Sequence, residues 1–396
     1  MSRARATCRP IRVLELRSVR GTGGGPEKTI LYGAERSDPA RVAVTVCYIR
    51  DARDGVFGIG GRAERLGVDY VEIVEKHSFD PRVWPALRRL VHERAIDIVH
   101  AHEYKTDLLA LLLAKSNGVI PLATSHGWTG HSRRERRVYY PLDKQILRTF
   151  PITIAVSGHI RSELVHAGVP AERVRVVLNG IDHELWRRDR TAEASARIRF
   201  GLASHEIVIG TAGRLEPQKR FDLLIEACAQ LRQYQPALRL LIAGDGSLQR
   251  DLQDLAARLL PPGSCRLLGH QDNVAALHHA SDVFVQSSDY EGTPNAVLEA
   301  MALETPVVAT AAGGTAEIAR HAVDALIVPT GDVVSLARAI DRTLSNRNET
   351  RARVARARQR IETVLSFDAR MHAVETIYAE LVERRRGSDA LEDQCA

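Results

Sequence analysis

The chain has 396 residues, of which 44% are hydrophobic and 26% charged, and its formal net charge is +6. This length exceeds what one hydrophobic core supports, so two domains are expected, and the composition argues against a disordered chain. Its five cysteines are scattered, odd in number and without a C-x-x-C pair, which argues against a disulfide framework and a zinc site.

Neither a secretory signal nor a membrane-spanning segment is expected. The first 20 residues carry six arginines with no apolar block between them. The longest purely apolar run, residues 108–114, is far shorter than the roughly 18 residues that suggest a spanning helix. We therefore expect a cytoplasmic protein.

Charge is distributed unevenly along the chain. Residues 1–190 hold 32 Lys and Arg against 22 Asp and Glu, and the remainder hold 23 against 27, of totals of 55 and 49. A basic first half suits nucleic acid, an anionic membrane surface or a phosphorylated substrate. Nucleic acid fits poorly, because aromatic residues make up only 5% of the chain and do not interleave with the basic ones.

Short β-branched runs alternate with helical patterns along the whole chain, which predicts βα units that build parallel sheets. In the first half, strands are expected at residues 11–16, 42–49, 71–74, 96–100, 122–125, 152–156 and 174–178. In the second half, strands are expected at residues 207–212, 238–243, 266–268, 283–286, 306–309 and 326–328. Helical patterns fill most gaps, for example at residues 85–94 and 221–231.

The polar segment 179–190 ends in a run of charges and predicts the junction between two domains. The predicted fold class is α/β, with two doubly wound, Rossmann-like parallel-sheet domains facing a deep cleft. We assign residues 1–185 to the first domain and 186–367 to the second, followed by a helix at 368–386 and a tail at 387–396. A further Arg/Ala-rich helix is expected at residues 347–360, with most of its charges on a solvated face.

The strongest local motif is a pair of carboxylates eight positions apart, Glu291 and Glu299, in the segment E-G-T-P-N-A-V-L-E. Proline favours the first turn of a helix, so a helix is expected to begin near Pro294, with Glu299 on it and Glu291 in the preceding loop. Free backbone N–H groups beside an acid can hold a phosphate and a sugar hydroxyl together. A capped helix after a buried strand explains the proline but not both acids.

Two cations, Arg214 and Lys219, follow Gly213 at the end of a predicted strand. A guanidinium binds phosphate oxygens bidentately and an ammonium adds a compact charge, so the pair suits a departing diphosphate. An exposed salt-bridged loop is the simpler alternative. A position outside the carboxyl ends of the strands, where ligands bind in open α/β sheets, would favour the functional interpretation.

Two weaker signals lie in the first half. The glycine-rich turn that contains Gly23 and Gly24 joins the first strand to the first helix and permits close backbone approach to a ligand. His126 follows another predicted strand, where its ring can orient a sugar hydroxyl or simply be a loop histidine. The pair His102 and Glu103 resembles half of H-E-x-x-H, but Thr106 stands where the second histidine belongs, which rejects a zinc protease.

A basic cluster follows the His126 loop and consists of Arg133, Arg134, Arg136 and Arg137. Two interpretations carry equal weight: a solvated helix face, or an anchor for acceptor phosphates or an anionic membrane surface.

Taken together, these motifs resemble glycosyltransferase family 4, whose members have the GT-B fold. The resemblance covers nearly the whole chain and also includes A-V-S at 155–157, V-L-N-G-I-D at 177–182 and A-G-D-G at 243–246. It implies that the carboxy-terminal helix crosses back to the first domain. One departure is Pro26, which stands before Glu27 where a small non-proline residue is usual.

The resemblance also implies roles for the site residues. Glu291 contacts the donor sugar and Glu299 the ribose, while Arg214 and Lys219 hold the diphosphate and His126 faces the transferred sugar. The remaining donor-binding positions lie in three loops: Gly23, Gly24, Gly213, Gly292, Thr293, Pro294 and Asn295.

The expected activity is that of a retaining hexosyltransferase that uses a nucleoside-diphosphate sugar, by default UDP-linked. The expected acceptor is a glycan or lipid-linked sugar of the cell envelope or of exopolysaccharide synthesis, with peripheral contact at the inner membrane face. No cofactor or metal is expected, because the chain lacks a D-x-D triplet and supplies its own cations. Two alternatives stay open: a nucleotide-sugar epimerase, which turns over without acceptor, and an inactive binding protein, which releases no nucleotide.

Overall fold

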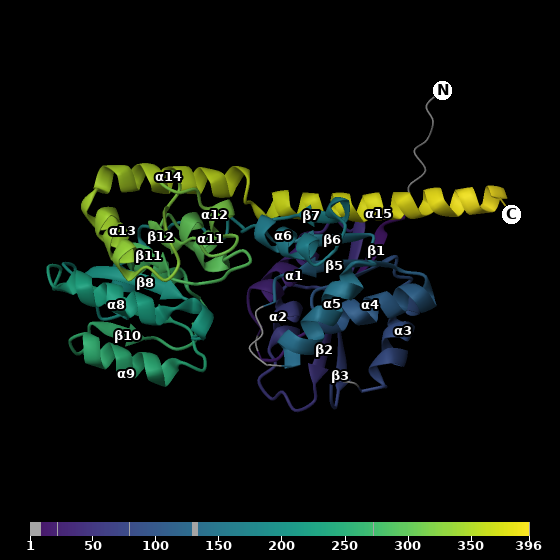
Figure 1. The fold of residues 1–396 in the computed structure, drawn as a ribbon, viewed down its shortest axis with the longest axis horizontal. Helices are drawn as coiled ribbons and strands as arrows, with labels where there is room; N and C mark the ends of the chain where they lie inside the picture. Colours follow the sequence, from purple (N-terminus) through teal and green to yellow (C-terminus); the bar gives the residue numbers. More distant parts are fainter. Residues whose placement is uncertain (1–8, 22, 79, 129–133, 272, 396) are drawn as a thin grey trace, which may run out of the picture. The chain divides into compact units, whose positions relative to one another are not determined.

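The computed structural model describes residues 9–21, 23–78, 80–128, 134–271 and 273–395 (Figure 1). The chain divides into two compact units. Unit 1 comprises Met1–Val177 and Arg370–Ala396, and unit 2 comprises Leu178–Ala369. Among the described residues, none of the helices combines the length and apolar character needed to cross a membrane.

Unit 1 is built on a seven-stranded parallel sheet with the strand order β3-β2-β1-β4-β5-β6-β7. Its strands are β1 Ile11–Ser18, β2 Val42–Asp51, β3 Tyr70–Glu75, β4 Ile98–Ala101, β5 Ile120–Ser125, β6 Ile152–Ala155 and β7 Val174–Val176. Its helices are α1 Gly25–Arg36, α2 Ile59–Arg65, α3 Val83–Glu93, α4 Tyr104–Asn117, α5 Tyr140–Leu147 and α6 Gly158–His166, with short turns η1 Glu135–Tyr139 and η2 Ala171–Arg173. Strands β2 and β3 lie on one side of β1 and strands β4 to β7 on the other, so the order of strands in the sheet reverses between β1 and β4.

Unit 2 repeats this plan with a six-stranded parallel sheet in the order β10-β9-β8-β11-β12-β13. Its strands are β8 Ile207–Ala212, β9 Leu238–Ala243, β10 Cys265–Leu267, β11 Val283–Gln286, β12 Val307–Thr310 and β13 Leu326–Val328. Its helices are α7 Ala192–Arg199, α8 Phe221–Arg232, α9 Gln249–Leu259, α10 Ala275–Ala280, α11 Asn295–Ala302, α12 Thr315–Ile318, α13 Val333–Ser345 and α14 Arg347–Thr363, with the turn η3 Pro217–Lys219. Here the reversal falls between β8 and β11.

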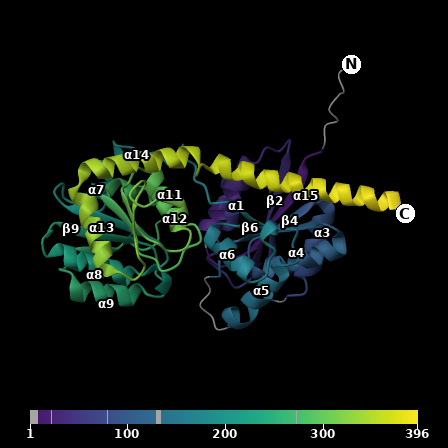
Figure 2. The same cartoon turned by 45° about the horizontal axis from the view of Figure 1, so that its top comes forward.

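Each sheet is central because its strands are apolar on both faces and must be covered by helices. In unit 2, residues of α8, α9 and α13 pack with the sheet in one cluster, and residues of α11 and α14 in another (Figure 2). All thirteen predicted strands are confirmed, with ends that shift by only a few residues. The α/β fold class with two doubly wound parallel sheets is confirmed as well.

The last helix, α15 Phe367–Cys395, begins at the end of unit 2 and belongs to unit 1 from Arg370 onward. Its apolar residues Val374, Ile377, Tyr378 and Leu381 pack with strands of the unit 1 sheet. The helix continues past Gly387, beyond the expected end at residue 386. A single glycine costs a helix only about 1 kcal/mol relative to alanine, so it does not by itself end one.

The division between the units falls at Val177, ahead of the expected boundary at residue 185. The polar segment after it is bound to unit 2 by Arg358 of α14, which donates hydrogen bonds to the main-chain oxygens of Trp186 (2.9 Å), Ala302 (2.7 Å) and His183 (2.8 Å). The side chain of Arg358 is only 14% exposed and therefore departs from the expected solvated face of this helix.

We predict that Arg358→Ala destabilises unit 2 by about 2–4 kcal/mol, because it leaves three main-chain carbonyls without a charged donor. The matched control is Arg356→Ala, which removes an exposed arginine of the same helix and is expected to stay within about 0.5 kcal/mol of the wild type. Native-state hydrogen exchange of the unit 2 amides measures the difference. Equal exchange in the two variants would contradict the assigned role.

Candidate functional site

In unit 2, the predicted site residues lie where β8 and β11 end, at the reversal of strand order. Gly213 directly follows β8, and Glu291 lies in the loop between β11 and α11. Ligands of open α/β sheets bind outside the carboxyl ends of the strands at such a reversal. The position therefore satisfies the condition set from the sequence for a functional interpretation of the cationic loop.

Lys219 and Glu291 meet in this region. The Lys219 ammonium donates to Oε1 of Glu291 at 2.5 Å, and the Ser288 hydroxyl donates to the same oxygen at 2.6 Å. Glu291 is 7% exposed, so its negative charge needs these partners. The sequence left open whether Lys219 lies in a salt-bridged loop or binds a diphosphate. Lys219 does form a salt bridge, and its partner is Glu291, the acid that is predicted to contact the donor sugar.

Backbone contacts tie the two loops together. The Ser287 hydroxyl donates to the main-chain oxygen of Lys219 at 2.8 Å, and the Asp289 N–H donates to that of Gln218 at 2.9 Å. Arg220 closes the arrangement with ion pairs to Asp222 and Asp289. The Arg214 side chain, in contrast, is exposed and has no hydrogen bond or ion pair to another described residue.

The helix after Glu291, α11, begins at Asn295, and Pro294 is its N-cap residue. This start is close to the expected one near Pro294. Glu299 lies on this helix and is 7% exposed. Gly292 and Thr293 complete the loop before it. The amide of Asn179, in the segment after unit 1, donates to Oδ1 of Asn295 at 3.2 Å.

In unit 1, the glycine turn lies between β1 and α1, and Gly23 adopts a positive φ of 72°. The buried carboxylate of Glu27 accepts the N–H of Gly24 (2.5 Å) and pairs with Arg17 (2.5 Å). Burial alone would raise the pKa of Glu27, but the Arg17 charge and the Gly24 N–H lower it overall. Pro26 occupies the first turn of α1, where its missing N–H costs nothing. The turn is thus held by Glu27, and the N–H of Gly24 is already used.

His126 follows β5 and is half-buried. Its Nε2 lies 3.3 Å from Nδ1 of His102, which follows β4, and the two rings stack at 5.6 Å between centroids. His102 in turn contacts the carboxylate of Glu15 on β1. The sequence alone did not indicate Glu15 and His102 as partners of His126, although a carboxylate in the middle of β1 and a histidine directly after β4 were a visible signal.

The basic cluster after His126 is only partly described. Arg133 lies outside the described residues, and the side chain of Arg136 is not described either. Arg134 and Arg137 are exposed, and the Arg134 guanidinium lies 5.3 Å from the centre of the Tyr139 ring. A solvated face and a phosphate anchor both remain compatible with this arrangement.

The position of Glu291 depends on a close backbone approach at Gly313. A Cβ atom on this glycine would lie 1.9 Å from the main-chain oxygen of Glu291, which also accepts the N–H of Gly314 at 3.1 Å. Only glycine permits this contact at the observed φ of 49°.

We predict that Gly313→Ala destabilises unit 2 by about 1–3 kcal/mol more than Gly331→Ala, because overlap adds to backbone strain at Gly313 only. Gly331 is the matched control, since it also has a positive φ (74°) but has open space around its Cβ position. Hydrogen exchange of the α11 amides measures the difference. Equal protection in both variants would refute the packing argument.

Comparisons with known proteins bear on the family of the chain. The family described as "Glycosyltransferase Family 4" matches residues 23–185, and "Glycosyl transferases group 1" matches residues 194–360. EpsD of Bacillus subtilis (strain 168), which is named as a glycosyltransferase, is 30% identical over 281 residues, or 68% of this chain and 73% of that one. Glycogen synthase of Mycobacterium tuberculosis is 30% identical over 300 residues, or 73% of this chain and 69% of that one.

Among solved structures, the complex of Anabaena HepE with UDP-glucose superposes with a TM-score of 0.81 at 20% identity and covers 94% of this chain and 100% of that chain. This likeness and the two parallel-sheet units confirm the expected GT-B fold. The chain belongs to the family 4 glycosyltransferases.

Proposed function

We propose that this glycosyltransferase moves a hexose from a UDP-sugar to a glycan or lipid-linked acceptor of the cell envelope, with retention of the anomeric configuration. The observation that carries the proposal is the ion pair between Lys219 and Glu291 at the reversal of strand order between β8 and β11. Arg214 lies just after β8, in the same loop as Lys219. HepE, which shares the fold, binds UDP and UDP-glucose, and this supports UDP as the nucleotide.

In unit 2, the donor diphosphate replaces Glu291 as the partner of Lys219. The ammonium then faces phosphate oxygens, and the exposed guanidinium of Arg214 adds a bidentate contact. Glu291, released from Lys219, accepts a hydrogen bond from a hydroxyl of the donor sugar. Glu299 accepts hydrogen bonds from the ribose.

The reaction breaks the bond between the anomeric carbon and the β-phosphate oxygen. Positive charge develops on the sugar while negative charge grows on the diphosphate, where preorganised cations and N–H groups stabilise it most effectively. The acceptor hydroxyl attacks from the face that the diphosphate leaves, and its proton passes to the departing phosphate. Attack on that face gives retention.

Charge stabilisation by Arg214, Lys219 and the amino terminus of α11 makes a divalent metal unnecessary for donor binding in this proposal. The chain also lacks the D-x-D triplet that metal-dependent transferases use. In unit 1, the exposed Arg134 and Arg137 are suited to the phosphates of a lipid-linked acceptor or to an anionic membrane surface. Such contact would place the enzyme at the cytoplasmic face of the membrane.

We predict that, in a thermal-shift panel of nucleotide sugars, UDP-sugars raise the melting temperature more than GDP- or ADP-sugars, because a ligand that binds only the native state stabilises it. The shift is expected to persist in EDTA. A larger rise in melting temperature with a sugar linked to another nucleotide would identify that nucleotide, instead of UDP, as the donor. Loss of the rise in EDTA would refute metal-independent binding.

We predict that Arg214→Ala lowers kcat by roughly 10²–10³-fold, a loss comparable to that of one preorganised donor at a developing charge, and leaves the fold intact. The matched control is Arg250→Ala, which removes another exposed arginine of unit 2 that is outside the site. Nucleotide release is measured with donor and acceptor together and with donor alone. Full activity of Arg214→Ala would remove its role in leaving-group stabilisation. Conversion of the donor alone into a different nucleotide sugar, followed by chromatography, would favour an epimerase.

A further inference from the structure

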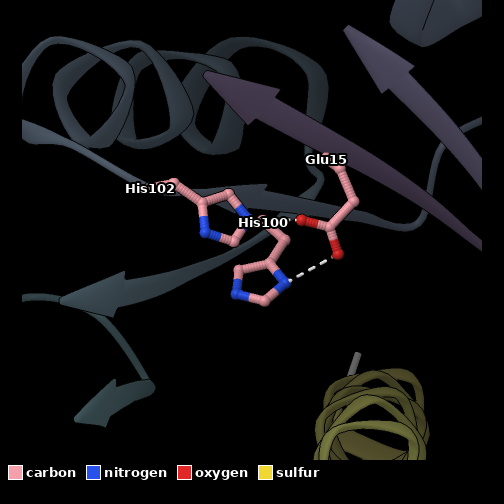
Figure 3. A group of neighbouring side chains, drawn as sticks. All are labelled: Glu15, His100 and His102. Atoms are coloured by element: carbon pink, nitrogen blue, oxygen red, sulfur yellow. Dashed lines mark hydrogen bonds and ion pairs between the residues drawn. The ribbon is translucent and has the colours of Figure 1, made fainter. Parts of the chain in front are cut away.

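A buried polar cluster in unit 1 consists of Glu15, His100 and His102 (Figure 3). The register of β1 and β4 places Glu15 beside His100, and His102 follows two residues later on the same side. Both histidines are almost fully buried, at 1% and 3% exposure. Figure 3 shows the two rings and the carboxylate gathered at one place, with α15 nearby.

Hydrogen bonds account for this cluster. Oε1 of Glu15 accepts the hydroxyl of Tyr378 on α15 (2.7 Å) and lies 3.1 Å from Nδ1 of His100, while Oε2 contacts Nε2 of His102. Nε2 of His100 lies 2.7 Å from the Thr124 hydroxyl. The same three residues have the composition of a metal site, but a metal would displace these hydrogen bonds.

The positions of the protons follow from the charge of Glu15. Burial raises its pKa, yet the two histidines hold the pKa well below the usual range, so the group is a carboxylate at neutral pH. A carboxylate only accepts hydrogen bonds, so Nε2 of His102 carries a proton and donates it. Burial lowers the pKa of His102 to about 4, which makes the ring neutral and leaves its Nδ1 without a proton.

The unprotonated Nδ1 of His102 faces Nε2 of His126 at 3.3 Å. Of these two nitrogens, only that of His126 can therefore supply the proton. Burial and the nearby Arg17 charge lower the pKa of His126 well below its usual value, so this ring is also neutral. Its single proton is on Nε2, and its Nδ1 is an acceptor.

We propose that Glu15 and His102 are positioning residues that hold His126 in the tautomer with its proton on Nε2, so that Nδ1 accepts a hydrogen bond from a hydroxyl of a sugar substrate. The inference rests on the proposed function for the identity of the hydroxyl, but the tautomer itself does not. The opposite tautomer presents an N–H to that hydroxyl and requires it to accept instead of donate.

The surroundings keep the chain of hydrogen bonds in this direction. Arg17 donates to the main-chain oxygen of His102 at 2.8 Å, and its charge, together with that of the buried Arg370, disfavours an imidazolium at His126. The Tyr378 hydroxyl fills the remaining side of the carboxylate. Tyr378 comes from α15, so the last helix of the chain takes part in orienting a histidine of its first half.

The experiment is nitrogen NMR of ring-labelled histidines in the full chain, with the His126 signals assigned by their loss in His126→Gln. The wild type is expected to show one tautomer at His126, with Nε2 protonated and Nδ1 bare. His102→Phe and Glu15→Gln are expected to give a mixed or reversed tautomer. His102→Asn, which retains an amide oxygen near the position of Nδ1, is expected to restore the wild-type pattern.

Kinetics separate positioning from folding. His102→Phe is expected to lower kcat by about 10- to 100-fold, as for one buried polar group left unpaired, with a smaller change in KM, and His102→Asn to recover most of the loss. His92→Phe, at an exposed histidine of α3, is the control and should match the wild type in both measurements.

Three outcomes would overturn the inference: a proton on Nδ1 of wild-type His126, an unchanged tautomer in both His102→Phe and Glu15→Gln, or one equivalent of metal whose removal changes the His102 signals. If no nucleotide sugar is turned over but the tautomer is as expected, the proposed function fails and the positioning of His126 stands. If turnover occurs and the tautomer is mixed, the reverse holds.

Discussion

The ion pair between Lys219 and Glu291 is the contact on which the candidate donor site depends. Glu291 is nearly buried, and a buried carboxylate without a partner would be strongly unfavourable. Lys219 supplies the opposite charge, and in the proposed function it exchanges that partner for a phosphate. The pair forms because adjacent strands β8 and β11 end side by side, and because the glycine at 313 lets a neighbouring loop touch the main chain of Glu291.

The same constraint governs unit 1, where the carboxylate of Glu15 within β1 meets histidines of β4 and of the segment that follows it, and through them the histidine that follows β5. None of these side chains can be buried unless each donor meets an acceptor, and this requirement determines the proton positions from Glu15 to His126. The glycine turn follows a related rule, since the buried carboxylate of Glu27 accepts the N–H of Gly24. In both units, hydrogen bonds within the protein therefore fix the buried polar side chains of the candidate site.

Family membership and substrate choice depend on different parts of the chain. The parallel sheets and their covering helices determine the fold, and the fold is shared with proteins only about 20% identical to this one. In such folds, ligands are generally selected by a few side chains in loops at the strand ends, where sequence changes without disturbing the core. Arg214 lies in such a loop, after β8, and its exposed side chain contributes little to packing.

The sequence by itself determined the thirteen strands, the α/β class and the family, because apolar periodicity and the order of motifs are local properties of the chain. It also identified Lys219 and Glu291, since each stands in a recognisable motif. It did not reveal that the two residues form a pair, nor the contacts of Glu15, His102 and Tyr378 around His126, nor that Arg358 binds the segment after unit 1. Only the tertiary structure decided these, because strand register and the course of α15 bring together residues that are from 24 to 363 positions apart.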